Sequence, residues 1–440
     1  MRSDVPCRST SVAVVTPVRL RLYKFGRGDH IPNFGEQVWS YGGAMEVSTL
    51  ESRAWRIAHS GLELDAAFTA FDALLRPHVQ YAIASWSTHD PATGLFTSCT
   101  MSGAPKDPVG EARLFRCEFS AGEPASYRSL IGQHGSAVIL SDVTEGELNR
   151  ASRYRDIFEP FGLTDELRAV LWVDGIAWGS ATLLRAGGRF EAGDVKVVSA
   201  IARQAADAIR LALLREAARR PEVVEEPPGI FSAEPDGLVN PTTVPAAYWL
   251  DLVGMKLVTA VNATAAAIRA NPGWSGASSR LALSDGRVLS IHAAAMIRDE
   301  GTVAVIVDRA RPAEVSAMLV DAYGLTARQR DVLGRLLLGR PMTHLAHSLG
   351  ISEHTAQDHR KAIYRQMGVS SRSELAAMLQ FEQYDPRVWN DTPPSPYGGF
   401  LEAPAMEPPK APQASNAAET NNLTSPTSDV KSDRTTAAVD

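Results

Sequence analysis

The order of apolar and polar residues predicts a first domain that mixes helices with antiparallel strands. Apolar residues recur at helical spacing over 50–75, and strand-like runs follow in YAIASWST (81–88) and ARLFRCEFS (112–120). Two alternating runs are then split by an Asp-Gly pair at 174–175, which predicts a β-hairpin. A helical repeat of Val, Ile and Ala over 194–220 closes the block, which we interpret as an α+β sandwich.

A second, smaller block of strands and helices follows the first. Asp-Gly turns at 236–237 and 285–286 lie within strand-like runs, and TVAVIVDRA (302–310) is one more run of this kind. The segments TVPAAYWLDLV and TAVNATAAAIRAN, between the two turns, have helical patterns. This order predicts a small antiparallel sheet with helices on one face.

A third block contains only helical patterns. LTARQRDVLGRLLLG is an amphipathic helix with Thr326 as its N-cap, THLAHSLG is a second helix that ends at Gly350, and ISEHT opens a third. Ser352 is the expected N-cap of that third helix. Two short helices joined by a Gly-containing turn, the second of them capped by Ser, are typical of a helix-turn-helix.

Composition separates these blocks from segments that we predict to lack a fold. Nine of the 27 prolines lie in the last 55 residues, where aromatic residues are scarce, so this tail cannot bury enough apolar surface to offset its ordering entropy. The first residues have no sustained periodicity, and PEVVEEPPG is a Pro/Glu-rich linker. The predicted parts are a poorly ordered segment (1–44), the first domain (45–218), a linker (219–228), the second domain (229–312), the helical domain (321–382) and a disordered tail (386–440).

Charge is distributed unevenly along the chain. The formal net charge of −6 does not indicate a generally basic nucleic-acid-binding protein. Over 323–380, however, seven Arg and one Lys face two Asp and two Glu, a net charge of +4. Any binding of nucleic acid must therefore come from this local basic patch.

Several other classes of function are not indicated by the sequence. It contains no P-loop, GxGxxG, GxSxG or HExxH motif and no CxxC pair, so we predict no enzyme, no catalytic or metal-binding residue and no cofactor. No uninterrupted apolar run reaches the ~18 residues that a membrane span needs. Three cysteines are too few for a disulfide framework, and we expect a cytoplasmic protein.

The third helix of the helical block has two distinct faces. At about 100° per residue, its inner face holds Ala356, His359, Ile363 and Met367. The opposite face, which is free to enter a DNA groove, holds His354, Gln357, Asp358, Lys361 and Arg365.

These residues lie in a stretch that resembles a known family. LTARQRDVL, Gly339, LAHSLGIS, HTAQDH, Ile363 and MGVSSRSEL are similar, with matching spacing over nearly 60 residues, to the four-helix LuxR-type DNA-binding domain of bacterial regulators. RYRDIFEPFGLTDELRAVLWVDGIAWGSATLLR and LVDAYGLTARQR are similar to actinobacterial regulators that place a GAF-like and a PAS-like sensor before that domain. The resemblance thus implies a multidomain protein with a GAF-like sandwich, a PAS-like domain and a LuxR-type helix-turn-helix domain.

The sequence departs from the family pattern at three positions. Gln329 replaces the usual Glu, Ala356 the usual Val, and Gln357 a frequent Lys. The smaller Ala reduces buried volume, at a cost on the ~1 kcal/mol scale of one or two methylenes. Without the Lys, one phosphate contact is lost, which should flatten the salt dependence of binding. In exchange, Gln357 can pair with adenine and the adjacent Asp358 can accept from cytosine N4.

The resemblance implies a sequence-specific transcription regulator whose N-terminal regions control DNA binding. Its partners would be double-stranded DNA, a second copy of the chain in a homodimer, RNA polymerase, and a small-molecule effector of unknown identity. The alternative is a ligand-responsive signalling adaptor whose helical domain binds protein instead. The expected DNA-binding residues are Ser352, His354, Thr355, Gln357, Asp358, Arg360, Lys361, Arg365 and Arg372.

The residues leave other roles open. Trp86, Trp172 and Trp178 fit either core packing or a ligand pocket, with core packing favoured. The helix over 194–220 fits either a dimerisation helix or the packing helix of the sandwich. For the His pair at 344 and 347, solvent-facing side chains are favoured over a metal site, because no third ligand is nearby in the sequence.

Overall fold

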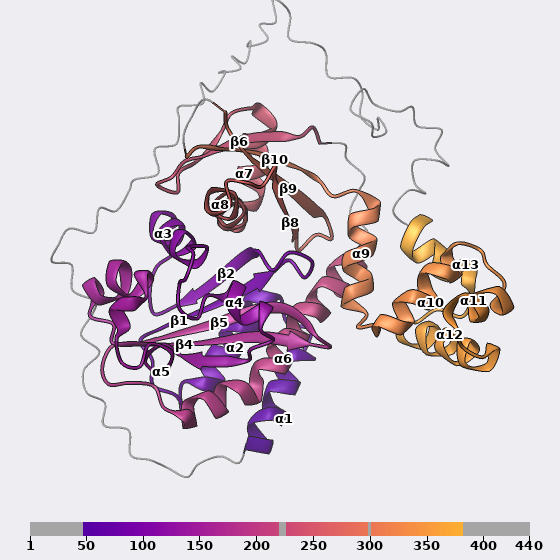
Figure 1. Ribbon diagram of the computed structural model, residues 1–440, viewed down its shortest axis with the longest axis horizontal. Coiled ribbons are helices and arrows are strands. Elements are labelled where there is room, and N and C mark those ends of the chain that lie inside the picture. Colours follow the sequence, from indigo (N-terminus) through magenta and orange to yellow (C-terminus); the bar gives the residue numbers. More distant parts are fainter. Residues whose placement is uncertain (1–46, 220–225, 298–300, 382–440) are drawn as a thin grey trace, which may run out of the picture.

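The structure is a computed structural model that describes residues 47–219, 226–297 and 301–381. The predictions for 1–44 and 386–440, and for most of the linker, lie outside these residues. Figure 1 shows two α/β domains side by side and a smaller helical lobe, to which they are joined through helix α9 (Pro312–Ala322). The two antiparallel sheets and the helical C-terminal lobe confirm the multidomain fold class predicted from the sequence.

The sheet of the first domain has five strands in the order β2-β1-β5-β4-β3, and each neighbouring pair is antiparallel. The predicted hairpin joins β4 to β5 through Asp174 and Gly175, whose φ angles of 51° and 77° fit a tight turn. The strands are β1 (Ile83–His89), β2 (Phe96–Ser102), β3 (Ala137–Ile139), β4 (Asp165–Val173) and β5 (Ile176–Arg185).

Three longer helices pack on one face of this sheet. They are α1 (Val47–Ala58), α2 (Leu64–Leu75) and α6 (Ala192–Ala217), so the helical pattern over 50–75 belongs to two helices. Trp86 and Trp178 are 2% and 1% exposed in the core that these helices share with the sheet. Trp172 packs at the edge of a smaller core and donates to the Gly135 carbonyl.

Short helical segments cover the opposite face, and here one prediction was wrong. Residues 112–118 of ARLFRCEFS lie in helix α3 (Pro108–Glu118), and the segment is not a strand. Asp107 starts this helix because its carboxylate accepts from two backbone N–H groups, with Pro108 in the first turn. The apolar residues of ARLFRCEFS fit the spacing of a helix as well as the alternation of a strand, and the Asp107 cap favours the helix. The other segments are α4 (Tyr127–Gly132), α5 (Leu140–Val143) and turns at Leu148–Arg150, Tyr154–Phe158 and Glu159–Phe161.

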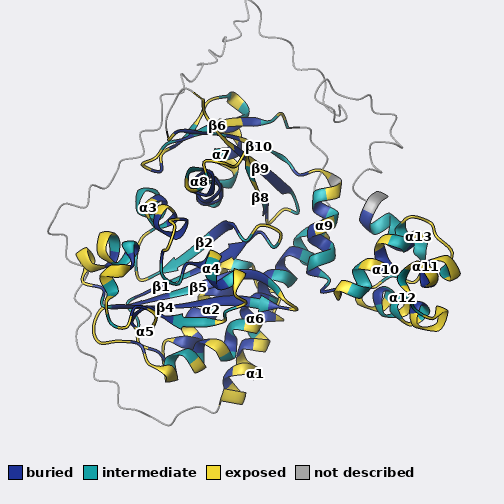
Figure 2. Ribbon diagram, viewed as in Figure 1, coloured by how far each residue is buried: buried dark blue, intermediate teal, exposed yellow. Residues whose placement is uncertain are grey.

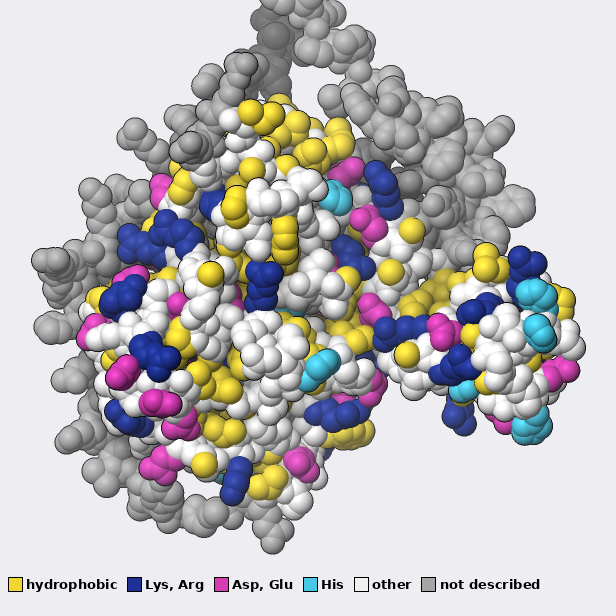
Figure 3. Space-filling view, in the orientation of Figure 1, with side chains coloured by type: hydrophobic (Ala, Val, Ile, Leu, Met, Phe, Trp, Pro, Cys, Tyr) yellow, Lys and Arg dark blue, Asp and Glu magenta, His cyan; other side chains and the backbone are white. Residues whose placement is uncertain are grey.

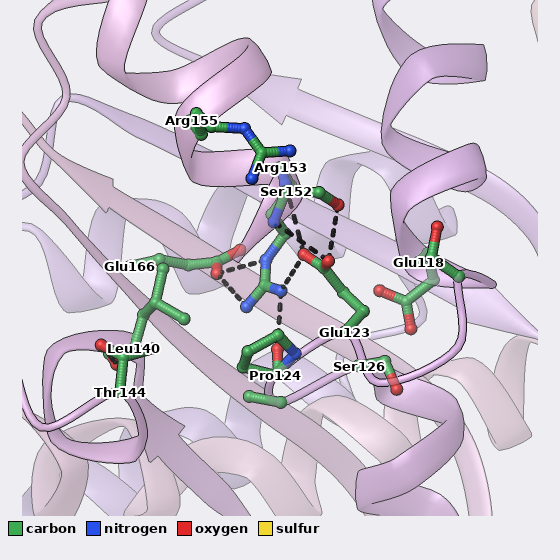
Figure 4. A network of polar contacts seen from close by, with 12 residues as sticks. Glu118, Glu123, Pro124, Ser126, Leu140, Thr144, Ser152, Arg153, Arg155 and Glu166 are labelled. Atoms are coloured by element: carbon green, nitrogen blue, oxygen red, sulfur yellow. Dashed lines mark hydrogen bonds and ion pairs between the residues drawn. The ribbon is translucent and has the colours of Figure 1, made fainter. Parts of the chain in front are cut away.

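A buried cluster of charges ties this face to strand β4. Arg153 has no exposed surface, and it donates to Glu166 at 2.7 Å, to Glu123 at 2.8 Å and to the Pro124 carbonyl (Figure 4). Its Nη2 is also 2.7 Å from the Glu166 carboxylate, outside hydrogen-bond geometry. Arg168 pairs with the other oxygen of Glu166 at 2.8 Å. Burial alone would raise the pKa of Glu166, but the two guanidinium groups hold it below its ordinary value.

The second domain repeats the strand arrangement of the first on a smaller scale. Its order, β7-β6-β10-β9-β8, is that of the first sheet when strands are numbered within each domain. Helices α7 (Val244–Val253) and α8 (Met255–Ala270) meet at Gly254 with a bend of 115°. The strands are β6 (Gly229–Ala233), β7 (Val239–Pro241), β8 (Ala277–Ala282), β9 (Val288–Ala295) and β10 (Val303–Arg309), and the predicted turns at 236–237 and 285–286 are confirmed.

Helix α8 lies between the two domains and is buried by both (Figure 2). Small side chains let it approach the first domain closely: Ala263, Ala266 and Ala267 share a core with Phe96 and Phe115. Within the described part of the chain, no single helix is long and apolar enough to cross a membrane; the bent pair α7–α8 meets those criteria by length and composition alone.

A second contact between the domains is a buried ion pair. Arg280 on β8 and Asp90 after β1 are 9% and 1% exposed, and their side chains meet at 2.6 Å. The backbone N–H of Arg280 also donates to this carboxylate, and its Nη1 donates to the Glu314 carbonyl of α9. One arginine therefore joins both domains to the helix that leads to the C-terminal lobe.

The C-terminal lobe is built from short capped helices. They are α10 (Ala327–Leu337), α11 (Met342–Leu349), α12 (Glu353–Met367) and α13 (Arg372–Ala376), followed by a turn over Ala377–Phe381. Thr326 caps α10 in a reciprocal pair with Gln329, so the Gln that replaces the family's Glu still completes the capping box. Leu333, Leu345 and Ile363 lie in the core that the helices share.

Candidate nucleic-acid interface

Helix α12 is fixed at both ends and along one face. The Ser352 hydroxyl accepts from the Thr355 N–H at 3.0 Å, and Gly368, with φ of 70°, ends the helix in a left-handed turn. Ala356 and Ile363 have no exposed surface. The predicted N-cap and inner face are therefore present, and the opposite face of α12 is presented outward.

The outward face carries a short row of charges that pair along the helix. His354 Nδ1 lies 3.1 Å from the Asp358 carboxylate, and Lys361 Nζ lies 3.8 Å from it. These side chains are 84%, 55% and 71% exposed, so the pairs contribute little to stability. Lys361 thus places a positive group beside Asp358, which reduces the repulsion between this carboxylate and a phosphate backbone.

The remaining predicted residues occupy different surroundings. Arg365 is exposed near the end of α12, whereas Gln357 and Arg360 are half-buried, with the Arg360 guanidinium 6.0 Å from the centre of the Tyr364 ring. Thr355 shares a hydrogen bond with the capping Ser352 hydroxyl.

Arg372 lies apart from the others, at the start of α13. Its Nη2 faces the turn at Gly339, is buried, and has no hydrogen-bond partner in the described part of the chain. The structure therefore brings most of the predicted residues together on α12, with Arg372 beside the end of α10.

Three arginines of α10 hold the lobe together. Arg328 donates to the Leu349 carbonyl at the end of α11, and Arg335 donates to Ser348. Arg330 donates to the Leu325 carbonyl and lies 3.3 Å from Asp321 of α9. Much of the local positive charge is thus engaged inside the lobe, which net charge alone could not reveal. Figure 3 shows Lys, Arg and His side chains on the outside of this lobe.

The lobe is attached to the rest of the molecule through α9, which the sequence analysis left unassigned. The Ser316 hydroxyl of α9 donates to the Leu379 carbonyl, and Gln366 of α12 donates to the carbonyls of Tyr323 and Gly324. On its other side, α9 packs against α6, where Arg210 donates to the Ala322 carbonyl at 2.9 Å.

Comparison with known families decides the identity of the lobe. The family model described as bacterial regulatory proteins, luxR family, matches residues 324–379. These residues form a luxR-family domain. The match contains α10 to α13, so the family predicted from the sequence is confirmed.

One curated transcriptional regulatory protein is similar to this chain over a short length. The transcriptional regulatory protein MctR from Rhizobium johnstonii is 39% identical over 51 residues, which is 12% of this chain and 24% of the relative. The chain thus spans about a quarter of that protein's length.

Solved structures with some similarity to the chain include GAF domains. One is the GAF domain of a phosphoenolpyruvate-protein phosphotransferase from Coxiella burnetii, at 14% identity and a TM-score of 0.30, which covers 40% of this chain and 99% of the other. SdiA from Escherichia coli covers 75% of this chain and 95% of its own at 12% identity and a TM-score of 0.25. At these scores the similarities carry no argument about what the chain binds.

Metal binding has no geometric support in the described ranges. No group of three or more His, Cys, Asp or Glu side chains there is placed to hold a metal ion. His344 and His347 of the luxR-family domain are both exposed on α11.

Proposed function

We propose that the chain is a sequence-specific DNA-binding transcription regulator whose N-terminal domains control its luxR-family domain. The observation that supports this most directly is α12, a helix capped at Ser352 and buried along one face, with its polar face outward. A helix held in this way fits the major groove of DNA, which is wide enough to admit one helix.

Roles divide along α12 by chemistry. His354, Gln357 and Asp358 lie toward its N-terminal end and carry the hydrogen-bonding groups that read base edges, with Lys361 beside them. Arg360 and Arg365, with Arg372 on α13, would anchor phosphates together with Lys361, which makes binding salt-dependent.

The N-terminal domains supply regulation in this proposal. Their strand arrangement, GAF-like and PAS-like in our interpretation, is suited to holding a small molecule. Their ties to α9 give a physical connection to the luxR-family domain. We further propose a non-enzymatic, cytoplasmic protein that acts as a homodimer on a pseudo-palindromic site and contacts RNA polymerase.

Selection of bound sequences from random duplexes, followed by footprinting of the full chain over a salt titration, tests the proposal. The expected result is one recovered motif with protection that weakens steeply as salt rises. If no duplex binds more tightly than random DNA at low salt, the signalling-adaptor alternative gains and the regulator proposal fails.

A matched pair of variants tests the division of roles. Gln357→Ala should change base preference at one position of the motif, because it removes a bidentate contact. Arg365→Ala should weaken all sequences alike and reduce the salt slope by about 1. If the two variants give the same pattern, the division between reading and anchoring residues is wrong.

A further inference from the structure

A cavity of about 590 Å³ lies between the first and second domains. Its volume falls within the ~300–1,000 Å³ of small-molecule sites. The first domain contributes α6 and the ends of β1 and β2, the second domain contributes β8 and the α7–α8 junction, and α9 contributes Met318. A molecule in this cavity would contact both domains and the helix that carries the luxR-family domain.

Almost every charged side chain that lines the cavity has a partner. The ion pairs are Glu63–Arg219 at 2.6 Å, Asp65–Lys256 at 3.0 Å, Asp90–Arg280 at 2.6 Å and Asp285–Arg287 at 2.6 Å. Glu216, near the end of α6, is the exception, since its carboxylate makes no hydrogen bond or ion pair with a described residue. Glu216 is therefore the carboxylate of this cavity that remains open to pairing with a bound cation.

Two other unpartnered polar atoms belong to side chains that line the same cavity. Trp178 Nε1 and His89 Nδ1 are buried and have no hydrogen-bond partner among the described residues, while Nε2 of His89 contacts the Ser180 hydroxyl at 2.9 Å. Burial lowers the pKa of His89 to about 3, so the ring is neutral and has one N–H and one bare nitrogen. Neither unpartnered nitrogen has accessible surface, so neither can reach a molecule in the cavity, and these two side chains contribute ring surface to it.

Apolar side chains line the cavity between Glu216 and these rings. Ile209 and Leu213 line the cavity on the face of α6 that also carries Glu216, at spacings of four and seven residues. Ile209 lies over Gly179, next to Trp178 in strand β5. At 1.5 Å per residue, the seven residues from Ile209 to Glu216 span roughly 10 Å.

We propose that this cavity binds a small amphipathic amine, with its ammonium group at Glu216 and its apolar body along Ile209 and Leu213. This proposal gives a site and a chemical class for the effector of the proposed regulator. The binding of the amine does not depend on the chain being a DNA-binding regulator. Only the effect of that binding on DNA affinity rests on the proposed function.

Binding of such an amine depends on the ionisation of Glu216. Burial raises the pKa of this carboxyl to about 7, with Glu63 adding to the rise and Lys256, Arg219 and Arg215 opposing it. The carboxylate that attracts an ammonium group is therefore mostly ionised at pH 8 and mostly protonated at pH 6. Affinity for an amine should fall about tenfold between these values, while a neutral compound should show no such dependence.

Isothermal titration calorimetry on the full chain, without DNA, tests this with three matched probes. Tyramine has an ammonium group, an aromatic body and a hydroxyl group; 2-(4-hydroxyphenyl)ethanol replaces the ammonium group with a hydroxyl; phenethylamine lacks the phenol. We expect tyramine and phenethylamine to bind at pH 8 and the neutral analogue to bind much more weakly, because only the amines can pair with Glu216. The Glu216→Gln variant should weaken tyramine at least about tenfold, whereas Glu51→Gln, an exposed carboxylate of α1, should leave it unchanged.

Melting temperatures of all variants without ligand identify any that fail to fold. Equal binding of tyramine and its neutral analogue, unchanged affinity in a folded Glu216→Gln variant, or no binding of any probe at millimolar concentration would each overturn the proposal. Each of these failures would leave the DNA-binding result untouched, because no DNA is present.

Discussion

Replacing Arg153 by Met should sharply destabilise the first domain. The guanidinium is completely buried and donates to Glu166, Glu123 and the Pro124 carbonyl. Methionine keeps much of the side-chain volume but leaves both carboxylates short of a partner. Removing one member of a buried ion pair costs about 3–5 kcal/mol in the free energy of unfolding. Because Glu166 keeps its ion pair with Arg168, we expect the loss in the free energy of unfolding to lie at the lower end of this range, about 3 kcal/mol.

The matched control is Arg155→Met, which lies two residues after Arg153 in the sequence (Figure 4). Arg155 is 52% exposed, pairs with the exposed Asp156 and donates to the Asn149 carbonyl at 3.4 Å, so its loss should barely change stability. Thermal unfolding of the full chain, followed by circular dichroism, should lower the first-domain transition of the Arg153 variant by roughly 6–12 °C.

The pH dependence gives a second, independent measure. In the native domain, the pKa of Glu166 is held below its unfolded value, so this group stabilises the fold above its unfolded pKa and the contribution is lost as pH falls through the folded pKa. Arg153→Met removes part of that contribution. The difference between variant and native protein should therefore shrink on acidification. Equal melting temperatures for the Arg153 and Arg155 variants, or a difference that grows on acidification, would refute the reasoning.

Three further substitutions probe contacts between the domains and within the luxR-family domain. Asp90→Asn should leave Arg280 without its buried countercharge, costing about 3 kcal/mol and raising hydrogen exchange in β8 and α9. Gly237→Ala should separate the unfolding of the two domains by calorimetry, because its Cβ would lie 2.3 Å from that of Ala112, an overlap worth about 1–3 kcal/mol. Ser352→Ala should lower the stability of the C-terminal lobe by about 1 kcal/mol in urea unfolding, since the α12 cap is lost.

Local sequence signals predicted the elements that depend on local chemistry. The caps at Thr326 and Ser352 and the Asp174-Gly175 turn are each decided by a few neighbouring residues, and all three are present. The inner face of α12 also followed from its period, because Ala356 and Ile363 must meet the other helices of a small lobe.

Contacts between distant segments were not predictable in the same way. The alanines of α8 predicted a helix but not that it would be buried between two domains, since small residues fit a core and an interface equally well. The α10 arginines counted as surface charge, although Arg328 and Arg335 satisfy α11. Glu216 carried no signal, because its lack of a partner depends on residues from both domains.

The position of α9 has a consequence for how signals could pass through the molecule. Its residues Met318 and Ala322 belong to the core of the first domain, whereas Val320 packs against the core of the luxR-family domain. Tyr323, directly after α9, packs against both cores. A molecule in the cavity and an operator at α12 would therefore act on one and the same helix. Linkage requires their effects to be reciprocal: whatever factor the effector applies to DNA affinity, DNA must apply to effector affinity. An operator duplex would then serve as a reagent for finding the effector, because it changes how tightly that molecule is held.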